Sequence, residues 1–292
     1  MDIADIEESA EPDQAEPGQA EPARIEPGRI EPVRVVVLGA GGRMGQDIIE
    51  AARRDEDFVV HGAVELPSHP IIGSSPNPDL PYLRVVSDLA AALEGADVMI
   101  DFTRPEATLG ALDAAARAGV AAVVGTTGLS GEQRFELAAF AETIPLVFSP
   151  NMSVGINMMI WLLRIATEAL GEDFDLEVFE MHHRHKVDSP SGTALRLAEV
   201  LCEARGLDPT TQLTFGRQGF KPRSPGEIGM QVLRGGDVAG EHTVYFLGDG
   251  ERLEITHRAS SRSVFSKGAL RAARWIKGKR AGLYGMDEVL GL

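Results

Sequence analysis

Short apolar runs alternate with segments of helical pattern between Val33 and Phe148, and this alternation limits the fold more than any other feature of the chain. A short apolar run bounded by turn residues is typical of a strand that is buried on both faces of a sheet. Strands that alternate with helices at this spacing predict a doubly wound parallel sheet. The predicted strands are residues 33–38, 58–64, 96–102, 120–124 and 145–148, and the predicted helices are residues 44–54, 106–118 and 131–141.

The pattern changes after Asn151, which predicts a second and smaller α+β domain. Val154–Leu170 has the pattern of a long helix, Asp175–Met181 alternates like a strand, and Pro190 begins another helix. Three later runs predict strands of an open mixed sheet, and they are residues 231–233, 242–246 and 252–256. A final helix over residues 266–277 could return to either domain, and the pattern alone leaves this open.

A repeat with Glu-Pro every five residues precedes the folded part of the chain. Residues 1–31 carry ten acidic and two basic side chains, a net charge of −8 that is half of the −16 of the whole chain. Proline at this spacing forbids a helix, and the segment has too little apolar surface to fold. We therefore expect residues 1–32 to form a disordered acidic tail, and we favour a solvating role over partner binding. The remainder is only mildly acidic and shows no nucleic-acid-binding surface.

The chain also lacks the signals of secretion and of membrane insertion. Its N-terminus is acidic, which excludes a secretory signal, and no apolar run approaches the ~20 residues that span a bilayer. Cys202 is the single cysteine, so neither a disulfide framework nor a thiolate metal cluster is expected. These features predict a cytoplasmic protein with no membrane partner.

A glycine-rich turn follows the first predicted strand and opens a helix. Glycines there permit a tight turn and let backbone N–H groups approach a pyrophosphate at the helix N-terminus. The spacing departs from the standard G-x-G-x-x-G, because the last glycine comes one residue late, at Gly45. A plain strand-to-helix connection is the alternative. Glu65, at the end of the second strand, favours a Rossmann-type dinucleotide site, where an acid binds the ribose hydroxyls. The candidate cofactor residues here are Gly39, Ala40, Gly41, Gly42, Arg43, Met44 and Glu65.

Glu65 also bears on the choice between NADH and NADPH. A carboxylate repels a 2′-phosphate, and the three residues that follow, Leu66 to Ser68, offer no compensating cation. Arg43 and Arg104 could supply one from neighbouring loops. We therefore expect NADH to be favoured, with NADPH possible.

Two further loops fall at the carboxyl ends of later strands, where doubly wound folds bind ligands. Both are small, polar and rich in backbone donors, so they suit a nicotinamide amide; ordinary turns are the alternative. Their candidate cofactor residues are Gly125, Thr126 and Thr127 in the first loop, and Ser149, Pro150, Asn151 and Met152 in the second.

The segment from Glu180 to Ala194 concentrates three imidazoles, an ammonium and two carboxylates. Adjacent histidines on a strand point to opposite faces, so His182 and His183 do not readily chelate one ion. His183 and His185 could share a face, but nothing nearby completes a ligand set, and no metal is predicted.

The same segment has the composition of a catalytic and anion-binding site. A histidine can give or take a proton at neutral pH, and Lys186 can protonate or neutralise a developing anion. The helix start near Pro190 places the Ser191 or Thr193 hydroxyl and backbone N–H groups where they could hold a carboxylate. These groups predict reduction of a small anion at a C=N or C=C bond next to a carboxylate. Surface histidines on a loop are the alternative.

The assembled motifs resemble the 4-hydroxy-tetrahydrodipicolinate reductase family, formerly called dihydrodipicolinate reductases. The resemblance runs from about Val33 to Leu292 and leaves the repeat tail unmatched. It is carried, in order, by residues 39–45, 101–106, 125–128, 149–157, 180–194, 234–243, 257–262 and 282–291.

The resemblance implies hydride transfer from NAD(P)H to a cyclic dicarboxylate with loss of a hydroxyl as water, in the diaminopimelate route to lysine. His182 falls on the family's catalytic acid/base and Lys186 on its proton donor, while His183, Gly192 and Thr193 fall on substrate contacts. The glycine turn, Glu65 and the two later loops fall on the cofactor site.

The resemblance also implies the domain plan and the assembly. Residues 33–152 with 262–292 would form the dinucleotide-binding domain, residues 153–261 would form the substrate-binding and oligomerisation domain, and a homotetramer is usual. Leu66 stands where NADPH-tolerant members often carry Arg, and Met152 stands where Phe is frequent. Two rivals remain: another two-domain NAD(P)-dependent imine or amino-acid dehydrogenase, and a nucleotide-sensing regulator without catalysis.

Overall fold

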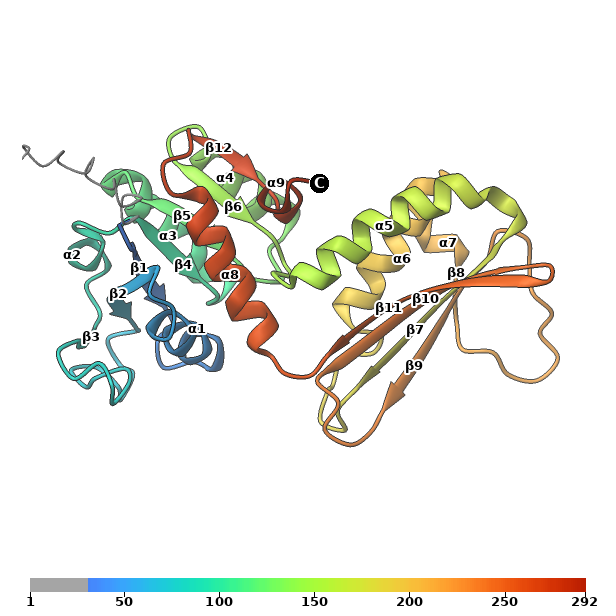
Figure 1. Ribbon diagram of the computed structural model, residues 1–292, viewed down its shortest axis with the longest axis horizontal. Coiled ribbons are helices and arrows are strands. Elements are labelled where there is room, and N and C mark those ends of the chain that lie inside the picture. Colours follow the sequence, from blue (N-terminus) through green and yellow to red (C-terminus); the bar gives the residue numbers. More distant parts are fainter. Residues whose placement is uncertain (1–30) are drawn as a thin grey trace, which may run out of the picture. The chain divides into compact units, whose positions relative to one another are not determined.

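A computed structural model describes residues 31–292, and two sheets organise this part of the chain (Figure 1). The predicted disorder of residues 1–30 falls outside the described residues. The first sheet has seven strands, and the second has five. Each sheet has its own hydrophobic clusters, and the cavity described below has lining residues from the elements of both.

The first sheet is parallel throughout, in the order β12-β6-β5-β4-β1-β2-β3. This order confirms the predicted doubly wound sheet, because the chain builds outward from β1 in both directions. The two-residue β3 and the edge strand β12 were not predicted. The strands are β1 (Val33–Leu38), β2 (Phe58–Val64), β3 (Val85–Val86), β4 (Val98–Asp101), β5 (Ala121–Val124), β6 (Pro145–Phe148) and β12 (Gly282–Tyr284).

Helices cover both faces of this sheet, and β1 shows how its sequence permits this. Val35 and Val37 pack in the cluster that contains α1 and α8, whereas Val36 and Leu38 pack in the cluster that contains α3 and α4. A strand segment buried on both faces has to be apolar at every position, which explains the run from Val35 to Leu38; Arg34, which precedes that run, is exposed. The helices are α1 (Arg43–Arg53), α2 (Leu89–Leu93), α3 (Pro105–Ala118), α4 (Gly131–Phe140), α8 (Ser263–Ile276) and α9 (Met286–Leu290).

The second sheet is mixed, in the order β11-β10-β7-β9-β8, as the changed pattern after Asn151 predicted. β7 runs antiparallel to β10 and parallel to β9. Helices α5 (Val154–Leu170) and α6 (Gly192–Arg205) pack on one face of it (Figure 1). The strands are β7 (Asp175–His182), β8 (Leu213–Phe215), β9 (Ile228–Arg234), β10 (Gly240–Gly248) and β11 (Glu251–Ala259); a 3-10 turn, η1 (Gly171–Asp173), and the short α7 (Pro209–Gln212) connect them.

The strands of the second sheet extend beyond the apolar runs that predicted them. β9 reaches Arg234, and β10 begins at Gly240, two residues before His242. The added residues Arg234 on β9 and Gly240 and Glu241 on β10 do not continue the apolar periodicity, which therefore ends before the strand does; β9 also starts three residues earlier than predicted, at Ile228. Helix α6 starts at Gly192 rather than at Pro190, because Ser191 is its N-cap and accepts a hydrogen bond from the backbone N–H of Ala194.

Helix α5 corrects one expectation from the sequence. Together with the turn that follows, residues Val154–Asp173 are long and apolar enough, by length and composition, to cross a membrane. A single helix of this kind is weak evidence, because core helices of other proteins pass the same test. Ile156, Met159 and Leu163 are buried, and the last two belong to the cluster under the second sheet.

Helix α8, whose destination the sequence left open, packs on the first sheet. Ala269, Ala272 and Ile276 belong to the cluster around β1, so the chain returns from the second sheet to the first (Figure 1). Gly268 makes this close approach possible. A Cβ placed on Gly268 would lie 1.7 Å from the carbonyl oxygen of Met152, which is closer than any real contact.

We predict that Gly268→Ala destabilises the protein by about 2 kcal/mol, because the added methyl group forces α8 away from Met152. The matched control is Gly110→Ala in α3, where a Cβ meets no atom within 4 Å. This control should gain up to about 1 kcal/mol from helix propensity. Urea unfolding of both variants measures the difference. Equal free energies of unfolding would show that α8 is not held against Met152.

Candidate functional site

The glycine turn lies at the carboxyl end of β1, beside the point where the strand order reverses between β1 and β4. Gly39 has a φ of 65°, which a residue with a side chain rarely adopts. A Cβ on Gly45 would lie 2.1 Å from the carbonyl oxygen of Gly39, so helix α1 packs directly on the turn. This packing therefore requires glycine at position 45, one residue later than in the standard motif.

Glu65 reaches the glycine turn from the end of β2. Its carboxylate accepts hydrogen bonds from the backbone N–H of Gly41 (2.9 Å) and from that of Leu66 (2.9 Å). His69 covers the turn from the other side, because a Cβ on Gly41 would lie 2.3 Å from its imidazole ring. The structure thus brings the predicted acid and the predicted turn together.

The two later loops lie at the carboxyl ends of β5 and β6, and only part of each faces the main cavity. Thr127, Ser149, Pro150 and Asn151 line it. The other predicted members are packed behind: the Thr126 hydroxyl accepts a hydrogen bond from the buried Thr108, Gly125 lies against the ring of Phe102, and the side chain of Met152 is fully buried.

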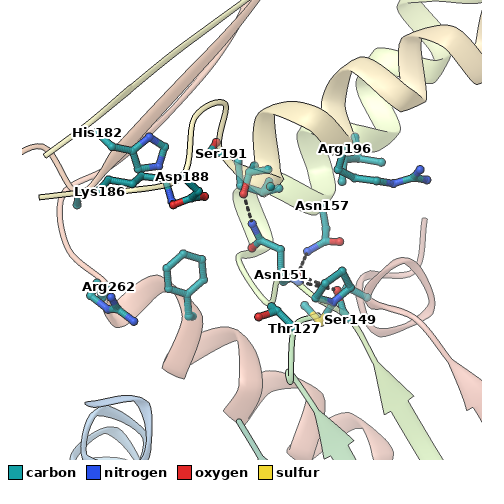
Figure 2. Close-up of a pocket in the computed structure, with 18 of the residues that line it drawn as sticks. Thr127, Ser149, Asn151, Asn157, His182, Lys186, Asp188, Ser191, Arg196 and Arg262 are labelled. Atoms are coloured by element: carbon teal, nitrogen blue, oxygen red, sulfur yellow. Dashed lines mark hydrogen bonds and ion pairs between the residues drawn. The ribbon is translucent and has the colours of Figure 1, made fainter. Parts of the chain in front are cut away.

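The main cavity has a volume of about 920 Å³ and takes its lining from both sheets (Figure 2). Figure 2 shows His182, Lys186 and Asp188 on one side and Thr127, Ser149 and Asn151 across from them. The predicted substrate residues His183, Gly192 and Thr193 also line it, whereas the glycine turn and Glu65 do not.

A hydrogen bond ties the two sides of the cavity together. The side-chain amide of Asn151, in the loop after β6, donates to the Thr193 hydroxyl in the first turn of α6 (3.0 Å). The Asn157 amide donates to the backbone carbonyl of Asn151 (2.8 Å) and so orients that loop. The first sheet is therefore linked to the helix N-terminus that the sequence identified as an anion site.

His182 ends β7, and a buried carboxylate holds its imidazole. The side chains of Glu180 and His182 share the inner face of the strand, because residues two apart point the same way. The Nδ1 atom of His182 lies 2.5 Å from the Glu180 carboxylate. The Nε2 atom faces Gly240, where an added Cβ would come within 2.9 Å of it.

Glu180 is fully buried and nevertheless charged. Burial alone would raise its pKa, but hydrogen bonds from His182, Arg234 and the Ser191 backbone N–H outweigh that effect and hold the pKa at about 2. Arg234 binds both carboxylate oxygens, at 2.8 Å each. Such a bidentate pair is strong and geometrically specific.

Lys186 lies in the loop after β7 and is paired with Asp188, its Nζ 2.9 Å from the carboxylate. This contact lowers the pKa of Asp188. Arg234 also donates a hydrogen bond to the backbone carbonyl of Asp188 (2.7 Å). The loop that carries Lys186 is therefore held by the same arginine that pairs with Glu180.

The N-terminus of α6 differs in one respect from the sequence expectation. The Ser191 hydroxyl is buried and accepts the capping hydrogen bond from Ala194, so it is not available to an anion. Gly192 and Thr193 line the cavity, and their backbone N–H groups belong to the first turn, where intrahelical partners are lacking. The backbone, rather than Ser191, can hold a carboxylate here.

His183 and His185 follow His182 out of the strand, and their ring centroids are 6.3 Å apart. His183 lines the cavity, and its buried Nδ1 atom has no hydrogen-bond partner among residues 31–292. His185 is exposed. Within the same range, no group of three His, Cys, Asp or Glu side chains is arranged to hold a metal ion.

His242 is a member of the site that the sequence analysis missed. Its ring contacts that of His182 edge-on at 5.1 Å, and its Nε2 atom lies 3.2 Å from the Ser191 hydroxyl. That hydroxyl already accepts from Ala194, so its own proton can go to Nε2 of a neutral ring. Burial, with the charge of His182 as a smaller cause, lowers the pKa of His242 from 6.5 to about 4.

Glu180 and several residues that line the cavity also escaped the sequence analysis, and for Glu180 one signal was available. Glu180 stands two residues before His182 on a strand, so a shared face could have been inferred. The remaining side chains come from elements far apart in the sequence, and no local spacing indicates their meeting. They include Asn157, Arg164, Arg196, Asp237 and Arg262.

Two family models match the chain, one over each of its two parts. Residues 33–152 match the family model described as Dihydrodipicolinate reductase, N-terminus, and residues 155–290 match Dihydrodipicolinate reductase, C-terminus. Two relatives are named 4-hydroxy-tetrahydrodipicolinate reductase. The one from Anaeromyxobacter dehalogenans (strain 2CP-C) is 50% identical over 264 residues, covering 89% of this chain and 98% of the relative. The one from Thiobacillus denitrificans is 46% identical over 263 residues, with the same coverage.

Solved structures share the fold. Dipicolinate-bound dihydrodipicolinate reductase from Paenisporosarcina sp. TG-14 aligns with a TM-score of 0.71 at 24% identity, covering 87% of this chain and 97% of that one. Amine dehydrogenase from Mycobacterium smegmatis aligns with a TM-score of 0.54 at 14% identity, covering 86% and 94%. At these identities the likeness concerns architecture alone.

We predict that His242 makes the protein less stable as the pH falls from 7 to 5. The unfolded chain takes up a proton near pH 6.5, whereas folded His242 does so only near pH 4, so stability is lost across this window. The loss should be about 2 kcal/mol at pH 5. The lowered carboxylate pKa values, such as that of Glu180, act below about pH 4.5 and do not contribute here.

Urea unfolding at pH 7 and pH 5 measures this effect. His242→Gln should reduce the difference between the two pH values and leave the part that comes from His257, whose pKa burial also lowers. His185→Gln, which changes an exposed histidine, should preserve the full difference. An unchanged pH dependence in His242→Gln would contradict the assignment.

Proposed function

The chain belongs to the dihydrodipicolinate reductase family, and we propose that it reduces 4-hydroxy-2,3,4,5-tetrahydrodipicolinate to 2,3,4,5-tetrahydrodipicolinate and water, with NAD(P)H, in the diaminopimelate route to lysine. One observation carries this proposal. A single cavity joins the carboxyl ends of β5 and β6 to His182, Lys186 and the N-terminus of α6. Groups for a nicotinamide, for proton transfer and for an anion thus line one space.

A pyridine nucleotide is the cofactor that the N-terminal family model implies. The N-terminus of α1 fits it, because its N-cap residue Gly42 has no side chain and no side-chain cap occupies the first turn, which suits a pyrophosphate. We assign the pyrophosphate and ribose to Gly39 through Met44 and to Glu65. Residues 125–127 and 149–152 would hold the nicotinamide end, with Thr127 and Asn151 facing the cavity. When bound, the nucleotide supplies the hydride.

A small dicarboxylate fits the opposite side of the cavity. Dipicolinate is bound in the Paenisporosarcina reductase, which has the same fold. In this chain we place one carboxylate at the backbone N–H groups of Gly192 and Thr193, which are free donors at a helix N-terminus. His183 is the third proposed contact, and its unpartnered Nδ1 atom supports this.

Two side chains are placed to handle protons beside that carboxylate. We assign Lys186 as the proton donor, since its ammonium lines the cavity and is held by Asp188. His182 serves as the acid/base, because its Nδ1 atom is bonded to Glu180 and its Nε2 atom remains for exchange with substrate or water. Departure of the hydroxyl as water requires such a proton.

The proposal extends to domains, assembly and location. Residues 33–152 with 262–292 would bind the nucleotide, and residues 153–261 would bind the substrate and form the oligomer. A homotetramer is supported by the sheet face opposite α5 and α6, which presents Phe179, Tyr245 and the half-exposed Leu233. The proposal includes a cytoplasmic location, with which the single, buried and unpaired Cys202 is compatible. Neither a nucleic acid nor a membrane partner is part of the proposal.

We predict that Lys186→Ala and His182→Ala each lower kcat at least about 100-fold, because each removes a proton-transfer group. NADH affinity should change little, since neither residue belongs to the proposed cofactor site. The assay follows NADH and NADPH oxidation with the condensation product of pyruvate and aspartate semialdehyde.

Lys279→Ala is the matched control, because Lys279 stacks on Trp275 and does not line the cavity. Absence of turnover by the native protein would favour another imine or amino-acid dehydrogenase. NADH binding combined with normal function of Lys186→Ala would favour a nucleotide-sensing regulator.

We also propose that NADH is favoured over NADPH, and Leu66→Arg tests this. Leu66 is exposed and follows the carboxylate of Glu65, so an arginine there would offset the repulsion of a 2′-phosphate. KM for NADPH should fall about tenfold, equivalent to about 1.4 kcal/mol, with little change for NADH. Leu283→Arg, which adds the same charge at the opposite edge of the sheet, should leave both KM values unchanged. A similar fall in that control would indicate a general charge effect.

A further inference from the structure

We propose that Glu180 is a positioning residue that fixes His182 in the tautomer with its proton on Nδ1 and aligns Lys186 and the N-terminus of α6 around the same substrate. This inference deepens the proposed function and rests on it. Glu180 lines no part of the cavity itself, so it acts through the groups that it contacts.

The carboxylate of Glu180 is fully enclosed and has four donors. One oxygen accepts from His182 Nδ1 and from Arg234, and the other accepts from Arg234 and from the Ser191 backbone N–H (2.9 Å). Burying a charge is costly unless it is paired and fully hydrogen-bonded. Replacing a buried ion pair as a whole by well-packed apolar side chains is often neutral or stabilising, so the pair of Glu180 with Arg234 is weak evidence of a role in stability. Stability alone therefore does not account for a carboxylate here.

The contact with His182 determines where the imidazole carries its proton. A carboxylate with a pKa of about 2 is ionised at neutral pH and can only accept a hydrogen bond. Nδ1 of His182 must therefore be the donor, and in the neutral ring Nε2 keeps a lone pair. This leaves Nε2, which has no hydrogen-bond partner among the described residues, able to take a proton and return it.

Two further contacts extend the alignment beyond His182. The Ser191 backbone N–H donates to Glu180 and so anchors the residue before the Gly192–Thr193 turn. Arg234 bonds to Glu180 and also to the Asp188 carbonyl, beside the carboxylate that pairs with Lys186. The acid/base, the proton donor and the anion-binding turn are thus fixed with respect to one carboxylate.

The other groups around His182 do not compete for this role. His242 on β10 packs edge-on against the ring, and its Nε2 atom is directed to Ser191 instead. Arg234 on β9 approaches the carboxylate, and Lys186 is paired with Asp188. Glu180 is the only carboxylate in hydrogen-bond contact with His182 among residues 31–292.

The test is Glu180→Gln, which keeps the size of the side chain and removes its charge. An amide nitrogen facing His182 would donate to Nδ1 and move the ring proton to Nε2. We expect kcat to fall about 100-fold or more, with KM for NADH within about threefold of the native value. Nitrogen-15 NMR of the His182 imidazole, assigned by its loss in His182→Gln, should report the change of tautomer.

Glu227→Gln is the matched control. Glu227 is also a buried carboxylate paired with an arginine, Arg217, but it lies outside the cavity lining. Its variant should lose stability while keeping kcat and the His182 tautomer. If Glu180→Gln retains native kcat, or loses activity only in proportion to the loss of folded protein and of NADH affinity, the positioning role is wrong.

The native protein provides a readout that needs no Glu180 variant. The neutral His182 ring should show its proton on Nδ1, and a proton on Nε2 would overturn the proposal even if Glu180→Gln fails to fold. The tautomer can be measured whatever the substrate is. A native protein that does not turn over the proposed substrate would therefore contradict the proposed function, while the NMR result still decides the role of Glu180.

Discussion

A single buried charge, the carboxylate of Glu180, is the constraint around which the cavity side of the second sheet is arranged. A carboxylate excluded from water has to be compensated, and four donors converge on it from β7, β9 and the residue that caps α6. Each donor belongs to a segment that also lines the cavity or adjoins it. The same hydrogen bonds therefore compensate the charge and align the groups around the cavity. Loss of the carboxylate would leave Arg234 buried without its partner.

The second requirement is that this arrangement meets the carboxyl ends of the first sheet. The chain passes between the sheets twice, in the loop after β6 and again between β11 and α8 (Figure 1). The first passage carries Asn151, whose amide binds Thr193, and the second carries Arg262, which lines the cavity. Helix α8 packs tightly enough against Met152 that only glycine fits at position 268. The two connections that join the sheets thus also line the cavity between them.

Much of the fold could be predicted from local pattern, because its strands and helices obey simple periodicities. The short apolar run of β1 predicted a buried parallel strand, and the comparisons and the sheet order confirm the fold. The short strands β3 and β12 were missed, since two or three residues carry no periodicity. The cavity side chains were predicted where they sit within one segment, as His182 and Lys186 do. His242 and Arg234 were missed as site members because their proximity depends on strand register, which local sequence does not encode.

The register also explains why the predictions failed where they did. The inner faces of β7, β9 and β10 are apolar at one end of the sheet and polar at the other. Because β7 is parallel to β9 and antiparallel to β10, the carboxyl ends of the first two meet the amino end of the third. Glu180 is thus opposite His242, and His182 is opposite Arg234. Apolar alternation stops at this end of each strand, so the predicted strands ended before Arg234 on β9 and began after Glu241 on β10; β9 was also predicted three residues short at its apolar end. The break in apolar patterning at the same edge of these three paired strands therefore coincides with the proposed site.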